Sequence, residues 1–293
     1  MSRVAYVDGV YRPHGDAAVH IEDRGYQFAD GVYEVIAVRG GTLVDEALHL
    51  ARLRRSLREL RIDRALDDAP LKFVLREVLR RNAVVNGIVY LQITRGIAPR
   101  DHAFPKAARP ILVVTARRSR PANPKLAEEG VPVITTPDIR WQRCDIKTIS
   151  LVANVLGKQQ AREAGAYEAW MVDDKGRVTE GTSTNAWIVT GDNQIVTRGA
   201  DHAILDGITR QSLIALIRRQ GYKFAERPFT VAEAKAAREA FLTSTTSDVM
   251  PVVAIDGQPI ANGVPGLLTQ KLRADYLAHL ASFETRPNGR SSG

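Results

Sequence analysis

The sequence predicts an α+β fold of mixed α/β character, arranged as two α/β domains. Gly31–Val38 is a mostly apolar, valine-rich run, which predicts a buried strand. After a Gly40-Gly41 turn, leucines recur at helical spacing, at Leu50, Leu53, Leu57 and Leu60. Strand and helix patterns do not alternate strictly along the chain, and this irregularity favours α+β or irregular α/β over a regular βαβ repeat.

The smaller N-terminal domain is expected to span residues 1–120. A hairpin should open it, because Asp8-Gly9 is a tight-turn dipeptide between the strand-like runs 3–7 and 10–12. The further elements expected here are a helix over Pro70–Ala83 and strands over Ile88–Thr94 and Ile111–Ala116.

The stretch Arg117–Gly130 contains Pro121, Pro124 and several charges, which indicates a linker with the domain boundary near Pro121. The larger C-terminal domain is expected over 121–285, followed by a disordered tail over 286–293. Its expected elements are strands over 131–135, 240–246 and 252–255, a hairpin around 173–176, and helices over 151–164, 208–220 and 267–281.

The net charge of +8 suits either a nucleic-acid-binding protein or a basic enzyme that favours anionic substrates. The chain has no basic tail, no interleaved aromatic and basic residues and no zinc-ligand spacing, so the charge is assigned to solvated helix faces and no metal is expected. It also has no apolar run near the roughly 20 residues of a membrane span, and its N-terminus lacks a signal-peptide core. Cys144 is the single cysteine, which excludes an internal disulfide and makes a reducing cytoplasm the expected location.

Lys147 interrupts the otherwise mostly apolar or neutral stretch Cys144–Val152. A lysine that enters a core is costly unless its nitrogen is used. An amine in apolar surroundings loses its proton more easily, and a neutral amine is the nucleophile that forms a Schiff base. The alternative is a lysine that reaches solvent or pairs with Asp145. Lys158, in a polar helical run, is expected to be solvated.

A carboxylate and a helix start follow later in the chain. Glu180 precedes Gly181 and three small hydroxyl residues; it could hold a pyridine nitrogen protonated, or the run could be an ordinary turn. Gly207-Ile208-Thr209 opens a helix whose N–H groups favour phosphate, although threonine is also a routine helix cap. The hydroxyls of Thr243–Asp248 either complete a phosphate site or form a polar turn.

These segments, in this order, resemble the fold-type IV pyridoxal-phosphate enzymes, and most closely the D-amino acid (D-alanine) aminotransferases. The resemblance covers nearly the whole chain, from about residue 3 to about residue 280. The matching runs are Glu22–Phe28, Asp30–Val35, Thr94–Gly96, Pro99–Pro105, Asp138–Trp141, Arg143–Lys147, Thr179–Gly181, Gly207–Arg210 and Thr243–Ser247.

The resemblance implies a role toward pyridoxal 5′-phosphate for several residues. Lys147 would form the Schiff base and move the proton at the substrate Cα, and Glu180 would pair with the pyridine nitrogen. The other implied contacts are Leu205 on the ring face and, at the phosphate, Arg52, Ile208, Thr209, Ser244 and Thr245.

The same resemblance implies that Tyr33, Arg100 and His102 bind the α-carboxylate of a D-amino acid. An arginine suits this role because its planar fork meets a carboxylate bidentately. From the residues alone, Arg100 beside Asp101 could equally be a surface ion pair. The chain departs from the D-amino acid pattern at Thr182, Thr184 and Asp206 and over 149–154, which leaves the side-chain preference open.

The function implied is a pyridoxal-phosphate-dependent D-amino acid transaminase that acts by a ping-pong mechanism through pyridoxamine phosphate. Its partners would be D-amino acids, 2-oxo acids and a second copy in a homodimer, with neither nucleic acid nor membrane. Three alternatives share the fold: a branched-chain L-amino acid transaminase, a transaminase of mixed specificity and an aminodeoxychorismate lyase-like enzyme. A non-catalytic basic binding protein is the alternative of another class.

Overall fold

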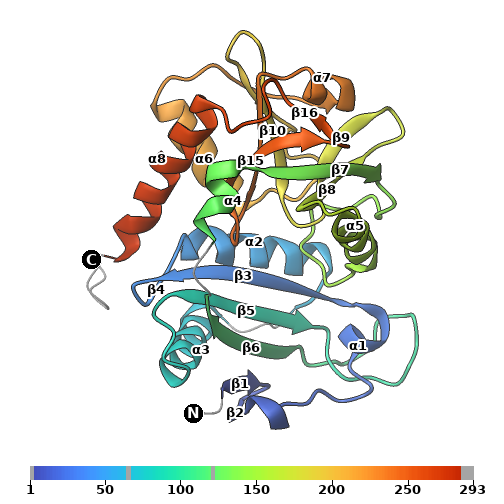
Figure 1. The fold of residues 1–293 in the computed structure, drawn as a ribbon. Helices are drawn as coiled ribbons and strands as arrows, with labels where there is room; N and C mark the ends of the chain where they lie inside the picture. Colours follow the sequence, from blue (N-terminus) through green and yellow to red (C-terminus); the bar gives the residue numbers. More distant parts are fainter. Residues whose placement is uncertain (1–2, 64–66, 120–122, 285–293) are drawn as a thin grey trace. The chain divides into compact units, whose positions relative to one another are not determined.

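The computed structural model describes residues 3–63, 67–119 and 123–284 (Figure 1). The chain divides into two compact units, one of residues 1–121, 146–150 and 280–293, the other of residues 122–145 and 151–279. The segment that carries Lys147 thus belongs with the first unit. The division into domains at 1–120 and 121–285 stays a prediction, and Pro121 and the expected tail over 286–293 lie outside the described residues.

The described part of the first unit contains a six-stranded sheet in the order β2-β1-β6-β5-β3-β4. Its strands are antiparallel, and helix α2 packs on β3 while α3 packs on β1 and β6. The elements are β1 (Val4–Val7), β2 (Val10–Pro13), the 3-10 helix η1 (His14–Asp16), α1 (Arg24–Phe28), β3 (Gly31–Arg39), β4 (Thr42–Leu43), α2 (Glu46–Glu59), α3 (Asp68–Arg81), β5 (Gly87–Thr94) and β6 (Ile111–Arg118).

The leucine repeat explains how α2 closes this core. Leu50, Leu53 and Leu57 are buried in one apolar cluster with the strand residues Val32 and Ile36. The polar and charged residues between the leucines leave the helix amphipathic, and burial of its apolar face rather than propensity holds it in place. The expected hairpin, strand and helices of this half are confirmed to within a few residues at their ends.

The described part of the second unit contains a ten-stranded mixed sheet in the order β12-β11-β10-β14-β15-β7-β8-β9-β13, with β16 paired to β15. Helix α5 packs on β7 and β8, and α6 packs on β14. The elements are α4 (Pro124–Glu129), β7 (Val131–Pro137), α5 (Val152–Glu163), β8 (Glu168–Val172), β9 (Arg177–Gly181), β10 (Asn185–Val189), β11 (Ile195–Thr197), α6 (Ile208–Arg219), β12 (Phe224–Glu226), β13 (Phe229–Thr230), α7 (Val231–Lys235), β14 (Glu239–Ser244), β15 (Asp248–Ile255) and β16 (Gln258–Pro259). The last helix, α8 (Leu267–Glu284), belongs to this unit up to residue 279 and to the first unit from residue 280.

The stretch expected to be a linker is partly a helix. Asn123 accepts a hydrogen bond from the Lys125 N–H and so caps α4, and Pro124 stands in the first turn, where its missing N–H costs nothing. Strand β6 also runs on to Arg118, into the stretch expected to be linker. None of the described helices combines the length and apolar character that crossing a bilayer requires.

Candidate active site

The Lys147 segment lies beside β3, to which it is joined by an isolated bridge between Thr148 and Val32. The Tyr33 N–H donates to the Lys147 carbonyl at 3.0 Å, and the Ile149 N–H donates to the Gly31 carbonyl at 3.1 Å. On the other side, the Lys147 N–H donates to the Ser56 hydroxyl of α2 at 3.2 Å. Gly31 is required here, because a Cβ would lie 2.7 Å from the Ile93 carbonyl oxygen and 3.1 Å from Ile149. Backbone bonds on both sides therefore fix the Cα of Lys147.

The Lys147 amine lies against an aromatic ring. Its Nζ is 4.1 Å from the centroid of the Tyr33 ring, which stacks on Tyr90 at 5.8 Å. Burial, together with the neighbouring Tyr33, raises the pKa of Tyr90 to about 12, so its hydroxyl stays neutral and donates to Gln92 at 2.6 Å. The contact with a ring face orients the lysine side chain. The structure thus brings together Lys147 and Tyr33, two of the residues expected at the site.

Arg52 lies in a buried charge cluster. Its Nε and Nη2 each donate to one carboxylate oxygen of Glu34 at 2.8 Å, and the His49 ring nitrogen lies 2.8 Å from the same carboxylate. Burial would raise the pKa of Glu34, but Arg52 and His49 outweigh it and lower that pKa to about 2. Burial lowers the pKa of His49, against the effect of Glu34. Arg52 therefore faces a permanent carboxylate, and its role at a phosphate stays a prediction.

In the second unit, Glu180 is a buried carboxylate at the end of β9. Its oxygens accept hydrogen bonds from Arg140 Nη1, from Asn185 Nδ2 at 3.0 Å and from the Leu205 N–H at 3.1 Å. Burial raises the pKa of Glu180 to about 7, although Arg140 and these hydrogen bonds lower it. Two carboxylate oxygens offer about four acceptor positions, so three donors leave room for one more.

Arg140 organises the surroundings of Glu180, and no role was expected for it from the sequence. Its guanidinium also donates to Asp138 at 2.7 Å and to the Ala203 carbonyl at 3.0 Å, while the Thr179 hydroxyl donates to Asp138 at 2.7 Å. Only 6% of the Arg140 side chain is exposed. The only sign of Arg140 in the sequence is that it lies within the matched Asp138–Trp141 run. Its partner Glu180 lies forty residues further along the chain, so no local pattern links the two.

Helix α6 begins directly after Gly207, and no side chain caps its first turn. A Cβ at Gly207 would lie 2.2 Å from the Asn185 side-chain oxygen, so glycine permits the close approach of Asn185, which also bonds Glu180 and the Leu205 carbonyl. Ile208 and Thr209 are buried in that first turn, and the Tyr276 hydroxyl lies 3.4 Å from Thr209 Oγ1. The uncapped N-terminus of a 12-residue helix is suited to an anion, because its free N–H groups and its dipole favour negative charge.

Ser244 and Thr245 lie at the turn between β14 and β15, next to the strand on which α6 packs. The Ser247 N–H donates to the Ser244 hydroxyl at 3.0 Å, and the Tyr167 and Ser247 hydroxyls lie 2.8 Å apart. The expected strand over 240–246 therefore ends at Ser244, where hydroxyl-to-backbone bonds replace the sheet ladder.

Arg100 and His102 lie on the exposed loop between β5 and β6. The Arg100 guanidinium lies 4.6 Å from the Phe28 ring centroid, and the His102 ring lies 5.3 Å from it. Their aromatic neighbour is therefore Phe28, whereas the ring neighbours of Tyr33 are Tyr90 and the Lys147 amine. The three residues expected to bind a carboxylate thus divide into a pair and a single residue.

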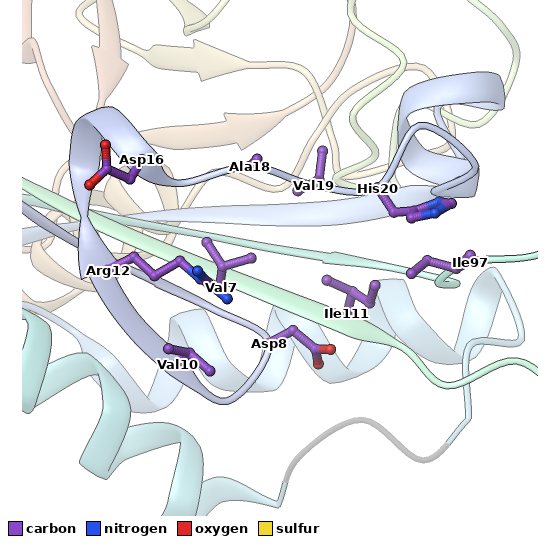
Figure 2. A pocket seen from close by; sticks show the side chains of 10 residues that line it. All are labelled: Val7, Asp8, Val10, Arg12, Asp16, Ala18, Val19, His20, Ile97 and Ile111. Atoms are coloured by element: carbon purple, nitrogen blue, oxygen red, sulfur yellow. The ribbon is translucent and has the colours of Figure 1, made fainter.

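The first unit also has a surface pocket of about 340 Å³, which contains none of the expected site residues (Figure 2). Figure 2 shows its side chains along hairpin β1–β2 and the segment from Asp16 to His20. The lining residues are Val7, Asp8, Val10, Arg12, Asp16, Ala18, Val19, His20, Ile97 and Ile111.

Comparison with known proteins gives consistent results. Residues 31–255 match the Amino-transferase class IV family. The chain is 43% identical over 267 residues to a D-alanine aminotransferase of Bacillus licheniformis, which covers 91% of this chain and 93% of that protein. It is 39% identical over 267 residues to a D-alanine aminotransferase of Listeria monocytogenes serotype 4b (strain F2365), which covers 90% of this chain and 92% of that protein.

A solved structure gives the same result at the level of the fold. It is a branched-chain amino acid aminotransferase of T.th. with pyridoxamine 5′-phosphate, which matches with a TM-score of 0.88 and 25% identity over 98% of this chain and 96% of that chain. The expected α+β fold is confirmed by this match. The family match and the relatives together show that the chain belongs to the class IV aminotransferases, a family of pyridoxal-phosphate-dependent enzymes.

Proposed function

We propose that the chain is a D-amino acid transaminase that converts D-alanine and 2-oxoglutarate to pyruvate and D-glutamate by a ping-pong mechanism. The observation that carries the proposal is the contact between the Lys147 amine and the Tyr33 ring, because it joins the expected catalytic residue to an expected substrate residue. The relatives at 43% and 39% identity that are named D-alanine aminotransferase support the choice of substrate.

The residues present fit pyridoxal 5′-phosphate. The fourth acceptor position of Glu180 suits the N–H of a protonated pyridine ring, and a cation there would favour the ionised carboxylate against the effect of burial. The uncapped first turn of α6 suits a phosphate. The residues that would hold the group, as the resemblance implies, are Arg52, Lys147, Glu180, Leu205, Ile208, Thr209, Ser244 and Thr245.

When bound, the cofactor supplies an electron sink for the bonds at the substrate Cα. Lys147 would take the Cα proton and return it, as a general base and acid whose position the bonds to Ser56 and Tyr33 fix. Glu180 would hold the proton on the ring nitrogen, and Arg140 favours the ionised form of that carboxylate by its charge and its hydrogen bond, against the effect of burial.

Tyr33, Arg100 and His102 would bind the substrate α-carboxylate. A hydroxyl, a guanidinium and an imidazole can each donate a hydrogen bond to a carboxylate. Several donors together fix the orientation of the carboxylate and stabilise its negative charge. A fixed carboxylate decides which face of the Cα carries the proton, so these residues would set the preference for the D-enantiomer.

The active assembly is proposed to be a homodimer, as the resemblance to the D-amino acid aminotransferases implies. The cytoplasmic location stays a prediction that depends on the single cysteine, Cys144. Size-exclusion chromatography with light scattering checks the first point, with a mass of twice 32.2 kDa as the expected result.

The test is a spectroscopic half-reaction of the purified, cofactor-loaded protein with a panel of D- and L-amino acids. D-alanine should discharge the visible absorbance of the bound cofactor fastest, and 2-oxoglutarate should restore it. Equal or faster reaction with L-leucine would favour the branched-chain alternative, which the similarity to the solved branched-chain enzyme supports at the level of fold. A protein that takes up no cofactor, with Lys147→Ala unchanged, would indicate a non-catalytic binding protein.

A further inference from the structure

Arg24 is a buried arginine whose guanidinium donates to three consecutive carbonyls of an exposed loop. Nη1 donates to the Asp101 carbonyl at 2.6 Å and to the Ala103 carbonyl at 3.3 Å, and Nη2 reaches the His102 carbonyl at 3.4 Å. Its Nε donates to the Asp30 carboxylate at 2.9 Å. Only 3% of the Arg24 side chain is exposed, whereas residues 100–104 are all exposed.

A buried guanidinium is costly, and here part of its hydrogen-bonding capacity goes to a surface loop. Its carboxylate partner Asp30 is shared with Arg95, which donates two hydrogen bonds to it at 2.7 and 2.9 Å and so fixes its position. The capping of α1 by Asp23, which accepts from the Gly25 N–H at 2.7 Å, fixes the backbone at Arg24. The conformation of the loop is thus determined from the interior of the first unit.

The side chains of the same loop are held by one ring. Phe28, at the end of α1, contacts the Arg100 guanidinium at 4.6 Å and the His102 ring at 5.3 Å, and Arg24 itself lies 4.9 Å from the same centroid. Such contacts restrict the rotamers of long polar side chains while leaving their donors free to meet a ligand. Arg24 fixes the backbone of the loop, and Phe28 restricts the side chains of Arg100 and His102.

We infer that Arg24 and Phe28 are positioning residues that set how tightly Arg100 and His102 bind a substrate carboxylate. This inference depends on the proposed function, since it takes Arg100 and His102 as the carboxylate-binding residues. Neither Arg24 nor Phe28 needs to touch the substrate. Their effect is to supply the loop in its binding conformation before the ligand arrives, so that the ordering cost is not taken from the binding free energy.

The test is a double-mutant cycle on the cofactor-loaded enzyme with Arg24→Gln, Arg100→Gln and the combination. Each single variant should raise KM for D-alanine and for 2-oxoglutarate by about tenfold, with a smaller change in kcat. A tenfold rise in KM corresponds to the loss of about one charge-assisted hydrogen bond. The double variant should raise KM by clearly less than the product of the two single effects, because Arg24 acts partly through the Arg100 donor that is already absent and only the His102 contribution remains to be lost. Arg109→Gln is the matched control, since it removes the same charge from the same loop at an exposed ion pair with Asp8.

The outcomes separate this inference from the proposed function. If Arg100→Gln leaves KM unchanged, both the carboxylate role of the loop and this inference are wrong. If Arg100→Gln raises KM but Arg24→Gln does not, or if the two effects multiply in the double variant, only the positioning role is overturned. Should Arg24→Gln fail to fold, Phe28→Leu replaces it in the same cycle and is expected to show the same coupling to Arg100.

Discussion

The Nζ of Lys147 lies 4.1 Å from the centroid of the Tyr33 ring, and the peptide groups of the same two residues are joined by a 3.0 Å hydrogen bond. Side chain and backbone thus connect one lysine to one tyrosine of β3. A change at Tyr33 is therefore expected to alter the position of the Lys147 amine.

The Arg140–Glu180 pair predicts a shift in the pH profile. In Arg140→Gln, Glu180 stays buried but loses its cation, so its pKa rises further above about 7 and the neutral form dominates at neutral pH. A neutral carboxyl cannot pair with a protonated ring nitrogen, and kcat at pH 7 should fall by about a hundredfold. The acidic limb of the kcat profile should move to higher pH, with partial recovery in Arg140→Lys. An unshifted limb would contradict the role of Arg140.

The buried pair of Glu34 and Arg52 predicts a large stability loss on Glu34→Gln. This substitution removes the carboxylate charge that both the Arg52 guanidinium and His49 contact in the buried cluster, at a cost of about 3 kcal/mol in the free energy of unfolding, measured by urea denaturation. Glu34 has a pKa lowered to about 2, so its stabilisation is fully present above about pH 4.5 and is lost as the pH falls through 2. The difference in the free energy of unfolding between wild type and Glu34→Gln should therefore become smaller below pH 4.5.

Glu77→Gln provides the matched control for that measurement. The pKa of Glu77 is also lowered to about 2, by hydrogen bonds from Arg80 and Arg81, but 70% and 40% of these arginine side chains are exposed. Surface ion pairs contribute little, so its effect on the free energy of unfolding should be much smaller. Equal effects of the two substitutions would show that burial at Glu34 does not matter.

Gly207→Ala tests the contact between the start of α6 and Asn185, which bonds Glu180. The new Cβ would lie 2.2 Å from the Asn185 oxygen, so Asn185 must move and its bonds to Glu180 and Leu205 weaken. Equilibrium dialysis should show cofactor affinity reduced by about tenfold, and the fold should lose about 1–3 kcal/mol. Gly191→Ala, where a Cβ meets nothing within 4 Å, should leave both quantities unchanged. Unchanged cofactor affinity in Gly207→Ala would show that the contact between this end of α6 and Asn185 does not contribute to cofactor binding.

Much of the fold could be predicted from local patterns. The leucine spacing of α2, the Asp8-Gly9 turn and the strand at Gly31–Arg39 are each decided within a few residues. Helix α4 escapes prediction because a proline such as Pro124 is typical of a linker as well as of a first helical turn.

The site is only partly accessible from the sequence. Lys147 and Glu180 stand out as charges in apolar or turn-like runs, but the partners that define them lie far away in the chain. Glu34 is the one charge inside its strand pattern, although its pairing with Arg52 requires the tertiary structure. Arg140 and Arg24 act through bonds to residues forty or more positions away, which no local pattern encodes.

Borohydride reduction of the cofactor-loaded protein followed by peptide mass spectrometry tests the central claim most directly. The chemistry fixes the cofactor to whichever lysine holds it. A cofactor-derived mass increase on the peptide that carries Lys147, absent in Lys147→Ala, is the predicted result. A label on another lysine such as Lys158, or an equal label in Lys147→Ala, would contradict the assignment of Lys147 as the cofactor lysine.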